Sequence, residues 1–597
     1  MRDAETILNI IRERGSRKLP LENIYRQLYN RNLYLYAYAR IYANDGAMTP
    51  GATDETVDGM SIAKIDALIE ELRYERFRWT PVRRKYIPKK NSNAKRPLGL
   101  PTWTDKLLQE VIRMILEAYY EPQFSSLSHG FRPKHGCHTA LQEIRRKWTG
   151  TIWFIEGDIT QCFDRIDHQV LMAILGEKLH DNRFLRLIGN LLQAGYLEDW
   201  QYHKTLSGTP QGGVVSPILS NIYLDRLDQF VEQKLLPLHN RGDKRKRNSE
   251  QQSLRKRARR REKAGKFEEA KRLRQQAQEI PSGDPNDPNF RRLRYVRYAD
   301  DILLSFAGPR IEAEEIKQQL AHFLREELKL ELSERKTLIT HARTEAARFL
   351  GYEIRTRHQN AKRDKDGRRC INGQIRLQVP IDVVKAKCRF YMRNGKPIHR
   401  SERIFDSDYS IVAQYQAEFR GIVEYYRLAE NLYRFSILKW MMERSLVMTL
   451  AAKHRTRVSR IYRKYKTVIK TDEGYYKVLK IVVPRGDEKP PLVAYWGGIS
   501  LRRKLGAVLN DQPATNFNQR SELLQRLLAN TCELCGSTDN IEVHHIRRLS
   551  SLKKKGRKEP QSWAKLMVRR RRKTLVVCRQ CHWDIHTGRS IEQKNSK

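Results

Sequence analysis

The chain has 597 residues and carries 115 lysines and arginines against 69 aspartates and glutamates, a formal net charge of +46. This length has room for about three or four domains, and the positive surplus suits a polyanion such as nucleic acid, bound more weakly as salt rises. No apolar run reaches the roughly 18 residues that span a bilayer, so we do not expect a membrane protein. The N-terminus has no signal-peptide apolar region.

The first patterned feature is a basic, proline-rich segment. Residues 88–90 and 95–101 bracket a polar turn at 91–93, which predicts a hairpin. Its cations Lys89 and Arg96 suit an anionic ligand, since arginine offers bidentate hydrogen bonds and lysine a point charge. The alternative interpretation, two surface cations among 115, would prevail without the flanking pattern.

Acidic residues follow predicted strands at two places. Residues 151–155 form a short apolar strand that leads to Asp158, and residues 293–298 form a run rich in β-formers before Asp300 and Asp301. A second apolar run follows the aspartate pair, so the two aspartates are predicted at the turn of a β-hairpin. Brought together in space, the three carboxylates can hold two Mg²⁺ ions that stabilise an in-line phosphoryl displacement. This chemistry predicts nucleotide polymerisation.

An aspartate pair alone is weak support, because solvated loops contain many of them. Here, however, four motifs occur in chain order: Asp158-Ile159-Thr160-Gln161-Cys162-Phe163-Asp164, Gly208-Thr209-Pro210-Gln211-Gly212-Gly213, Tyr298-Ala299-Asp300-Asp301 and Phe349-Leu350-Gly351-Tyr352. This series resembles the palm motifs of reverse transcriptases. A ribosomal or chromatin-type protein would explain the charge but not the ordered motifs.

The resemblance implies roles for individual residues. It implies that Asp158, Ile159, Asp300 and Asp301 hold the two Mg²⁺ ions and that the three aspartates are catalytic. It further implies five nucleotide contacts: Lys89 and Arg96 to the triphosphate, Phe163 as an aromatic gate under the sugar, Gln211 beside nucleotide and template, and Lys336 to the pyrophosphate. An ordinary turn before a helix near residue 216 is the alternative for the glycines after Gln211, and an exposed helix-end lysine is the alternative for Lys336.

An insertion at about 241–289 interrupts the palm motifs. It carries two runs of cations at residues 244–247 and 255–261, and the pattern around residues 262–271 predicts an exposed helix, polar all round. We expect a basic arm for structured RNA. The alternative is a plain solvated helix.

Two further motifs narrow the family. Residues 128–133 (Ser-His-Gly-Phe-Arg-Pro) resemble a motif of group II intron and related bacterial reverse transcriptases, and residues 421–426 (Gly-Ile-Val-Glu-Tyr-Tyr) resemble the thumb, or domain X, of group II intron maturases. Apolar residues at helical spacing around positions 415–446 predict a helical bundle for that thumb. Position and charge suggest a DNA-binding region after residue 470, although no motif marks it.

The C-terminus contains cysteine and histidine clusters. Two Cys-x-x-Cys pairs, four of the eight cysteines of the chain, predict a tetrahedral structural Zn²⁺ site made by Cys532, Cys535, Cys578 and Cys581. The histidines between and beside them resemble an HNH endonuclease. The resemblance implies that His545 is the general base and that His544, His582 and His586 surround a divalent catalytic metal, expected to be Mg²⁺. The central Asn of the pattern is absent and Thr574 stands near its place, and a purely structural zinc ribbon is the alternative.

Together these features resemble a group II intron-encoded protein of the bacterial and mitochondrial branch. We expect an α+β multidomain chain: a right-hand polymerase with an antiparallel palm sheet and an α-helical thumb, followed by a zinc-containing ββα HNH domain. The expected divisions are an N-terminal extension (1–80), fingers and palm (81–375), thumb (376–470), DNA-binding region (471–528) and HNH domain (529–597).

The resemblance implies intron RNA, double-stranded target DNA and dNTPs as partners, and no membrane. It implies a bacterial cytoplasmic location, near the nucleoid during DNA targeting, with an organelle as the alternative. A retron-type or diversity-generating reverse transcriptase would lack the thumb and HNH motifs. A degenerate maturase would lack the intact aspartates. The intron, its target site and the oligomeric state stay open.

Overall fold

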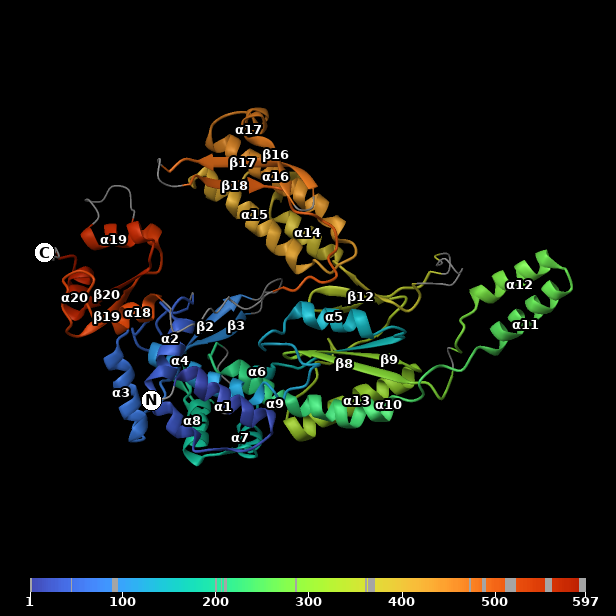
Figure 1. The fold of residues 1–597 in the computed structure, drawn as a ribbon, viewed down its shortest axis with the longest axis horizontal. Coiled ribbons are helices and arrows are strands. Elements are labelled where there is room, and N and C mark those ends of the chain that lie inside the picture. The colour runs from blue at the N-terminus through green and yellow to red at the C-terminus, as the bar shows by residue number, and fades with distance from the viewer. Residues whose placement is uncertain are drawn as a thin grey trace.

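A computed structural model describes the chain in thirteen stretches: residues 3–44, 46–88, 95–198, 201–205, 207–208, 212–284, 287–359, 362, 371–471, 474–485, 490–509, 522–552 and 561–589. Helices and sheets alternate throughout, which confirms the mixed α+β, multidomain prediction (Figure 1). Within these stretches, no helix is long and apolar enough to cross a membrane.

The N-terminal region is helical. Asn30 and Ser61 accept hydrogen bonds from backbone N–H groups at the starts of α2 and α3, which fixes where these helices begin. Helices α1 and α2 pack against α4, and their apolar faces join one core. The bounds are α1 (Ala4–Ser16), α2 (Arg31–Ile41), α3 (Ile62–Arg73) and α4 (Trp103–Tyr120).

The predicted basic hairpin is confirmed as two antiparallel strands, β2 (Val82–Pro88) and β3 (Lys95–Leu100). They form a four-stranded sheet in the order β3-β2-β6-β7, with β6 (Tyr196–Glu198) parallel to β2. The remaining strand is β7 (Gln201–His203). Lys89, which follows β2 in the sequence, lies outside the described residues.

The sheet expected to form the palm, called the palm below, is four-stranded and antiparallel, in the order β10-β4-β9-β8. Its strands are β4 (Trp153–Asp158), β8 (Arg292–Tyr298), β9 (Asp301–Ala307) and β10 (Ile339–His341), which confirms both the strand that leads to Asp158 and the aspartate hairpin. Alternate residues of these strands enter two different cores, because successive side chains point to opposite faces.

Helices cover both faces of this sheet. One face packs against α13 (Arg310–Leu328), and the other against α5 (Cys137–Lys147) (Figure 1). Helix α9 begins at Ser216 with a proline in its first turn, as the sequence predicts. The remaining helices of this part are α6 (Cys162–Arg165), α7 (His168–Gly176), α8 (Asn182–Gln193), α9 (Ser216–Phe230) and α10 (Leu236–His239).

The insertion forms a hairpin of two helices, α11 (Ser249–Lys263) and α12 (Phe267–Glu279), that projects from the palm (Figure 1). The prediction of one helix through residues 262–271 is wrong. Gly265 adopts a φ of 72° and ends α11, a conformation that favours glycine. The two helices pack through small buried side chains: Ala258, Ala270 and Ala277.

The thumb is less purely helical than expected. Its helices are α14 (Ile381–Arg389), α15 (Asp408–Tyr425), α16 (Phe435–Lys453) and α17 (Val458–Tyr465). A sheet of β16 (Lys466–Thr471), β17 (Gly474–Val483) and β18 (Leu492–Trp496) packs on α15. Trp496 of this sheet is buried against Tyr415 and Phe419. The boundary expected at residue 470 therefore falls inside a β-hairpin that shares the thumb's core.

A smaller sheet joins the palm to the thumb. It contains β11 (Ala347–Phe349), β12 (Tyr352–Thr356) and β13 (Ile375–Gln378), all antiparallel. The motif at residues 349–352 is the tight turn between β11 and β12.

The C-terminal part has the expected ββα arrangement. Strands β19 (Ile541–His545) and β20 (Thr574–Cys578) pair antiparallel, and α20 (Arg579–Thr587) follows β20 directly. Two more helices, α18 (Glu522–Leu528) and α19 (Ser562–Arg570), complete it. Its apolar residues continue the core of the N-terminal helices, so the two ends of the chain pack together (Figure 1).

Candidate functional site

The palm aspartates lie where two strands end. Asp158, the last residue of β4, is directly opposite Asp301, the first residue of β9. Asp300 occupies the two-residue turn that joins Tyr298 to Asp301. Directly opposed side chains of antiparallel strands are neighbours, so the backbone register alone brings the three predicted carboxylates into one region.

These carboxylates repel one another. Burial, followed by the charges of Asp300 and Asp158, raises the pKa of Asp301 to about 6. Burial and the Asp158 charge also raise the pKa of Asp300. A single ammonium offsets part of this charge, because Lys336 Nζ lies 2.7 Å from Asp158 Oδ2. Such an excess of negative oxygen ligands fits divalent cations such as Mg²⁺.

Convergence of the palm carboxylates is incomplete. Among the described residues, two other groups of side chains have all their ligand atoms within 4.8 Å of one another, but the oxygens of these three aspartates do not. Two interactions explain why the carboxylates stay apart: Lys336 pairs with Asp158, and the three carboxylates repel one another.

Ile159 is placed to offer its backbone. It forms an isolated bridge with Leu332 in which Ser333 N–H donates to the Asp158 carbonyl and Thr160 N–H donates to the Glu331 carbonyl. This bridge uses the backbone groups on either side of Ile159. The Ile159 carbonyl therefore faces the opposite side of the strand, where β9 and the aspartate turn lie.

A buried ion pair holds the aspartate turn from beneath. Arg297 and Asp228 have fully buried side chains and pair through two contacts, of 2.8 Å at Nε and 2.5 Å at Nη2. Arg297 also donates to the carbonyl of Ala299, which adopts a φ of 54° in the turn. The Tyr295 hydroxyl donates to Asp228 at 2.7 Å. The pair therefore fixes the backbone conformation just before Asp300.

The motif at residues 128–133 supports the same turn. A Cβ atom on Gly130 would lie 2.2 Å from the nitrogen of Ala299, so only glycine allows this approach. The backbone N–H of His129 donates to the Arg297 carbonyl, and Asn221 donates to the Gly130 carbonyl. The motif at residues 128–133 therefore packs against the aspartate turn and helps to hold its backbone in place.

The predicted nucleotide contacts surround the aspartates in part. The charge of Arg96 partly opposes the rise in the pKa of Asp300, so Arg96 lies near that carboxylate. Lys336 contacts Asp158. Phe163 is half-buried, with its ring centroid 6.1 Å from that of Phe131. Gln211 lies outside the described residues, as Lys89 does.

The thumb motif contacts the turn between β11 and β12. The hydroxyls of Tyr425 and Tyr426 donate to the carbonyls of Leu350 and Gly351, each at 2.9 Å. The Tyr352 hydroxyl donates back to the Tyr425 carbonyl at 2.5 Å. The motifs at residues 349–352 and 421–426, which the sequence presents separately, therefore contact each other and hold the thumb against the palm.

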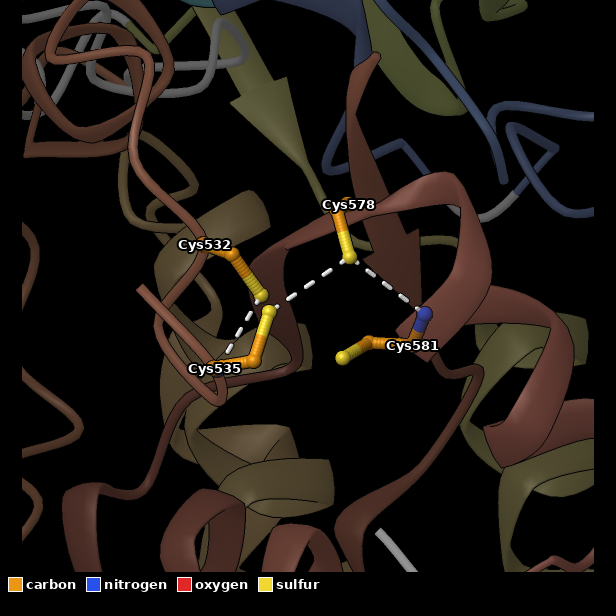
Figure 2. A group of neighbouring side chains, drawn as sticks. All are labelled: Cys532, Cys535, Cys578 and Cys581. Atoms are coloured by element: carbon orange, nitrogen blue, oxygen red, sulfur yellow. Dashed lines mark hydrogen bonds between the residues drawn. The ribbon is translucent and has the colours of Figure 1, made fainter. Parts of the chain in front are cut away.

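The four predicted zinc cysteines converge. The sulfurs of Cys532, Cys535, Cys578 and Cys581 lie within 4.8 Å of one another, and Figure 2 shows them facing a common centre. The backbone N–H groups of Cys535 and Cys581 donate to the first sulfur of their own pairs, at 3.4 and 3.5 Å. Four thiolates at this spacing are the donor set of a structural Zn²⁺ site.

Three of the four predicted HNH histidines form a second cluster, with an unexpected acid. Ligand atoms of Asp58, His544, His582 and His586 all lie within 4.8 Å of one another. Because His582 and His586 are four residues apart on α20, they share one helix face, as predicted. The His582 Nδ1 atom is 2.8 Å from Glu542 Oε2, which leaves Nε2 facing the cluster.

Ion pairs between the Asp58 carboxylate and the histidines hold this cluster together. Burial acts to lower the pKa of His582, but hydrogen bonds with Asp58 and Glu542 raise it to about 9. His544 is 3% exposed; its Nε2 atom has no hydrogen-bond partner, and its Nδ1 atom lies 3.4 Å from Asp58 Oδ1. Buried imidazole nitrogens that face a carboxylate fit a divalent metal.

His545 faces away from this cluster. Its Nε2 atom is 3.2 Å from the Tyr38 hydroxyl, its Nδ1 atom is 3.1 Å from the Val543 carbonyl, and burial lowers its pKa to about 4. Its strand partner across the sheet is Thr574, the residue in the place expected for Asn.

Several residues of these sites escaped sequence reasoning. They are Asp58, Asp228, Arg297 and Glu542, which lie far along the chain from the motifs or within ordinary strands and helices. The alternation of β8 could have marked Arg297, because it places this cation on an inward-facing position of an apolar strand. No local pattern marks Asp58.

Comparisons with known proteins match three parts of the chain to families. Residues 87–354 match the reverse transcriptase (RNA-dependent DNA polymerase) family, residues 372–481 the type II intron maturase family, and residues 532–582 the AI2M/AI1M-like HNH endonuclease family.

Single relatives match nearly the whole chain. The group II intron-encoded protein LtrA of Lactococcus lactis is 38% identical, over 94% of each chain. The COX1/OXI3 intron 1 protein of Saccharomyces cerevisiae is 32% identical, over 96% of this chain and 71% of its own. Among solved structures, a Candida tropicalis telomerase is 12% identical with a TM-score of 0.32, covering 65% of this chain and 55% of that one.

The buried ion pair under the aspartate turn yields a prediction of stability. Asp228→Ala leaves the Arg297 guanidinium buried without its partner, so we expect a loss of about 3–5 kcal/mol in the free energy of unfolding. Urea denaturation followed by tryptophan fluorescence measures this. The control is Glu314→Ala, which removes the exposed partner of Arg310 and is expected to cost about 1 kcal/mol or less. Equal losses in the two variants would contradict the assignment.

The cysteine cluster yields a second prediction. Cys578→Ser should remove zinc and unfold the C-terminal part locally, because bound zinc supplies much of the folding free energy of such a small unit. Elemental analysis gives the zinc content, and limited proteolysis reports the unfolding. Cys388→Ser, which changes a buried cysteine outside the cluster, should keep both zinc and protease resistance. Full zinc content in Cys578→Ser would refute the site.

Proposed function

Because this chain belongs to the group II intron-encoded proteins, with a reverse transcriptase, a maturase and an HNH endonuclease domain, we propose that it performs three linked tasks. It binds its intron RNA and assists splicing. It copies that RNA into DNA from a 3′-OH in the target, and it nicks the second target strand. The observation that carries the proposal is the register that places Asp158 opposite Asp301 beside Asp300.

In the polymerase site, Asp158, Asp300, Asp301 and the Ile159 carbonyl would hold two Mg²⁺ ions. Bound there, the ions stabilise the attacking and leaving oxygens of the in-line displacement. Arg96 and Lys89 bind the triphosphate, and Lys336 is placed to follow the pyrophosphate as it leaves. Phe163 lies beneath the sugar and excludes a 2′-OH, and Gln211 orients the nucleotide against the template.

The maturase task depends on the positive surface. The chain has a net charge of +46, and the projecting α11–α12 hairpin presents exposed cations on both helices. We assign this arm, together with exposed cations of the thumb in and before α17 (Arg455, Arg457, Arg460 and Arg463), to intron RNA, where phosphate contacts supply affinity. The expected DNA-binding region, residues 471–528, then binds target DNA. We place this activity in a bacterial cytoplasm.

In the HNH site, His544, His582 and His586 would hold a divalent cation. Three imidazoles suit Zn²⁺ or a related transition metal rather than the Mg²⁺ expected from the sequence. His545 is the proposed general base that activates water. Its buried position against Tyr38 implies that the N-terminal helices move away before it acts. His544 is the alternative base.

The polymerase assignment predicts that Asp301→Asn abolishes cDNA synthesis, since losing one carboxylate weakens the paired cation site. RNA binding should be unchanged, because it depends on cations far from the palm. Primer extension on an RNA template and filter binding of intron RNA measure the two effects. Asp539→Asn makes the same chemical change at an exposed position and should leave both unchanged. Wild-type extension by Asp301→Asn would exclude the assignment.

The HNH assignment predicts that His545→Ala lowers second-strand nicking by about 10²- to 10⁴-fold, the usual contribution of a general base, and leaves primer extension intact. A strand-specific nicking gel of the ribonucleoprotein on target DNA measures this loss. The control is His322→Ala, at an exposed histidine of α13. Retained nicking by His545→Ala would transfer the role of base to His544.

A further inference from the structure

The N-terminal region contributes a side chain to the HNH histidine cluster. Asp58 lies in the loop before α3, yet its Oδ2 atom is 2.8 Å from His586 Nε2. Its Oδ1 atom is 3.2 Å from His582 Nε2 and 3.4 Å from His544 Nδ1. One carboxylate thus contacts a nitrogen of each histidine expected to bind the metal, across almost the whole length of the chain.

Backbone pairing holds Asp58 in this position. Gly59 N–H donates to the Val543 carbonyl at 3.0 Å, and Val543 N–H donates to the Met60 carbonyl at 2.9 Å. The segment therefore adds to the free edge of β19 as a short antiparallel strand. In addition, the backbone N–H of His545 donates to Asp58 Oδ1 at 2.6 Å. These backbone hydrogen bonds fix the position of the Asp58 carboxylate beside the histidines.

The donor set suits a divalent cation. Three imidazoles and one carboxylate are the ligands that Zn²⁺ and related metals accept at a four-coordinate site. Glu542 fixes His582 from the outside, as outer carboxylates do for metal-binding histidines. The buried Nε2 atom of His544 has no hydrogen-bond partner, which also indicates that a ligand belongs there.

At a four-coordinate metal such as Zn²⁺, four protein ligands leave no place for substrate. Catalytic metal sites keep an open position, whereas structural sites are closed. A DNA phosphate needs such a position, and Asp58 fills it. The same N-terminal region also covers His545 through Tyr38, which is fully buried.

We propose that Asp58 is the fourth ligand of the HNH metal and that the N-terminal region thereby closes the nuclease site until a target-DNA phosphate oxygen replaces the Asp58 carboxylate. The exchange breaks one metal–carboxylate contact and forms one metal–phosphate contact, with no covalent change in the protein. The closing role rests on the proposed nuclease function, but the ligand role does not.

The first test measures metal affinity. Full-length protein carrying Asp300→Asn and Asp301→Asn, to remove the polymerase metals, is loaded with one equivalent of Zn²⁺ to fill the cysteine cluster alone. It is then titrated with Mn²⁺, and free Mn²⁺ is followed by electron paramagnetic resonance. Adding Asp58→Ala should weaken Mn²⁺ binding by at least the roughly 10-fold that loss of an outer-shell partner costs. Asp58→Asn, which can still accept the His545 hydrogen bond, should also weaken it. Asp54→Ala, at an exposed position of the same loop, should not. Wild-type affinity in Asp58→Ala would overturn the ligand assignment.

The second test measures closure. In an otherwise wild-type chain at saturating Mn²⁺, Asp58→Ala should nick non-target double-stranded DNA faster than the wild type or Asp54→Ala. Equal or slower nicking would overturn the closing role. A wild-type ribonucleoprotein that binds Mn²⁺ but never nicks its target would instead overturn the proposed nuclease function. Weaker Mn²⁺ binding by Asp58→Ala would still support the ligand role in that case.

Discussion

Repulsion between like charges is the constraint around which the palm is organised. The register of β4 and β9 forces Asp158 and Asp301 to face each other, with Asp300 beside them. Burial and neighbouring charge raise the pKa of Asp301 to about 6, so the site favours any cation that can neutralise it. Lys336 supplies one charge, and divalent cations with hard oxygen preferences suit the remainder.

Holding such a strained group of charges requires a rigid support. Arg297 and Asp228 pair without solvent exposure beneath the turn, and Gly130 lets the backbone of another loop press against Ala299. A buried ion pair adds little net stability over an apolar core, but it fixes one geometry because each partner is costly to leave alone. In this palm, the interaction positions the carboxylates while remaining out of reach of substrate.

Much of this arrangement could be predicted from local sequence. Period-two alternation marks β8 and β9, the aspartates interrupt it, and Cys-x-x-Cys spacing identifies the sulfur cluster. Other features arise from contacts between distant segments, about which periodicity carries no information. Asp58 reaches His586 through strand pairing at the edge of β19, and Tyr425 reaches Leu350 only because the thumb folds back. The break between α11 and α12 was missed because charged residues dominate both helices and the nearest large apolar residue, Phe267, is exposed. No apolar stripe therefore shows where one helix ends.

Locating the metal ions and the Lys336 ammonium tests most directly whether the palm carboxylates are organised to hold divalent cations. Crystals of the protein with an RNA–DNA primer-template and a non-hydrolysable dNTP, soaked in Mn²⁺, would give an anomalous difference map. The account predicts Mn²⁺ peaks between Asp158 and the Asp300–Asp301 turn, with the Lys336 ammonium displaced from Asp158 toward the triphosphate. A map with no peak among these carboxylates, and with Lys336 still paired to Asp158, would contradict it.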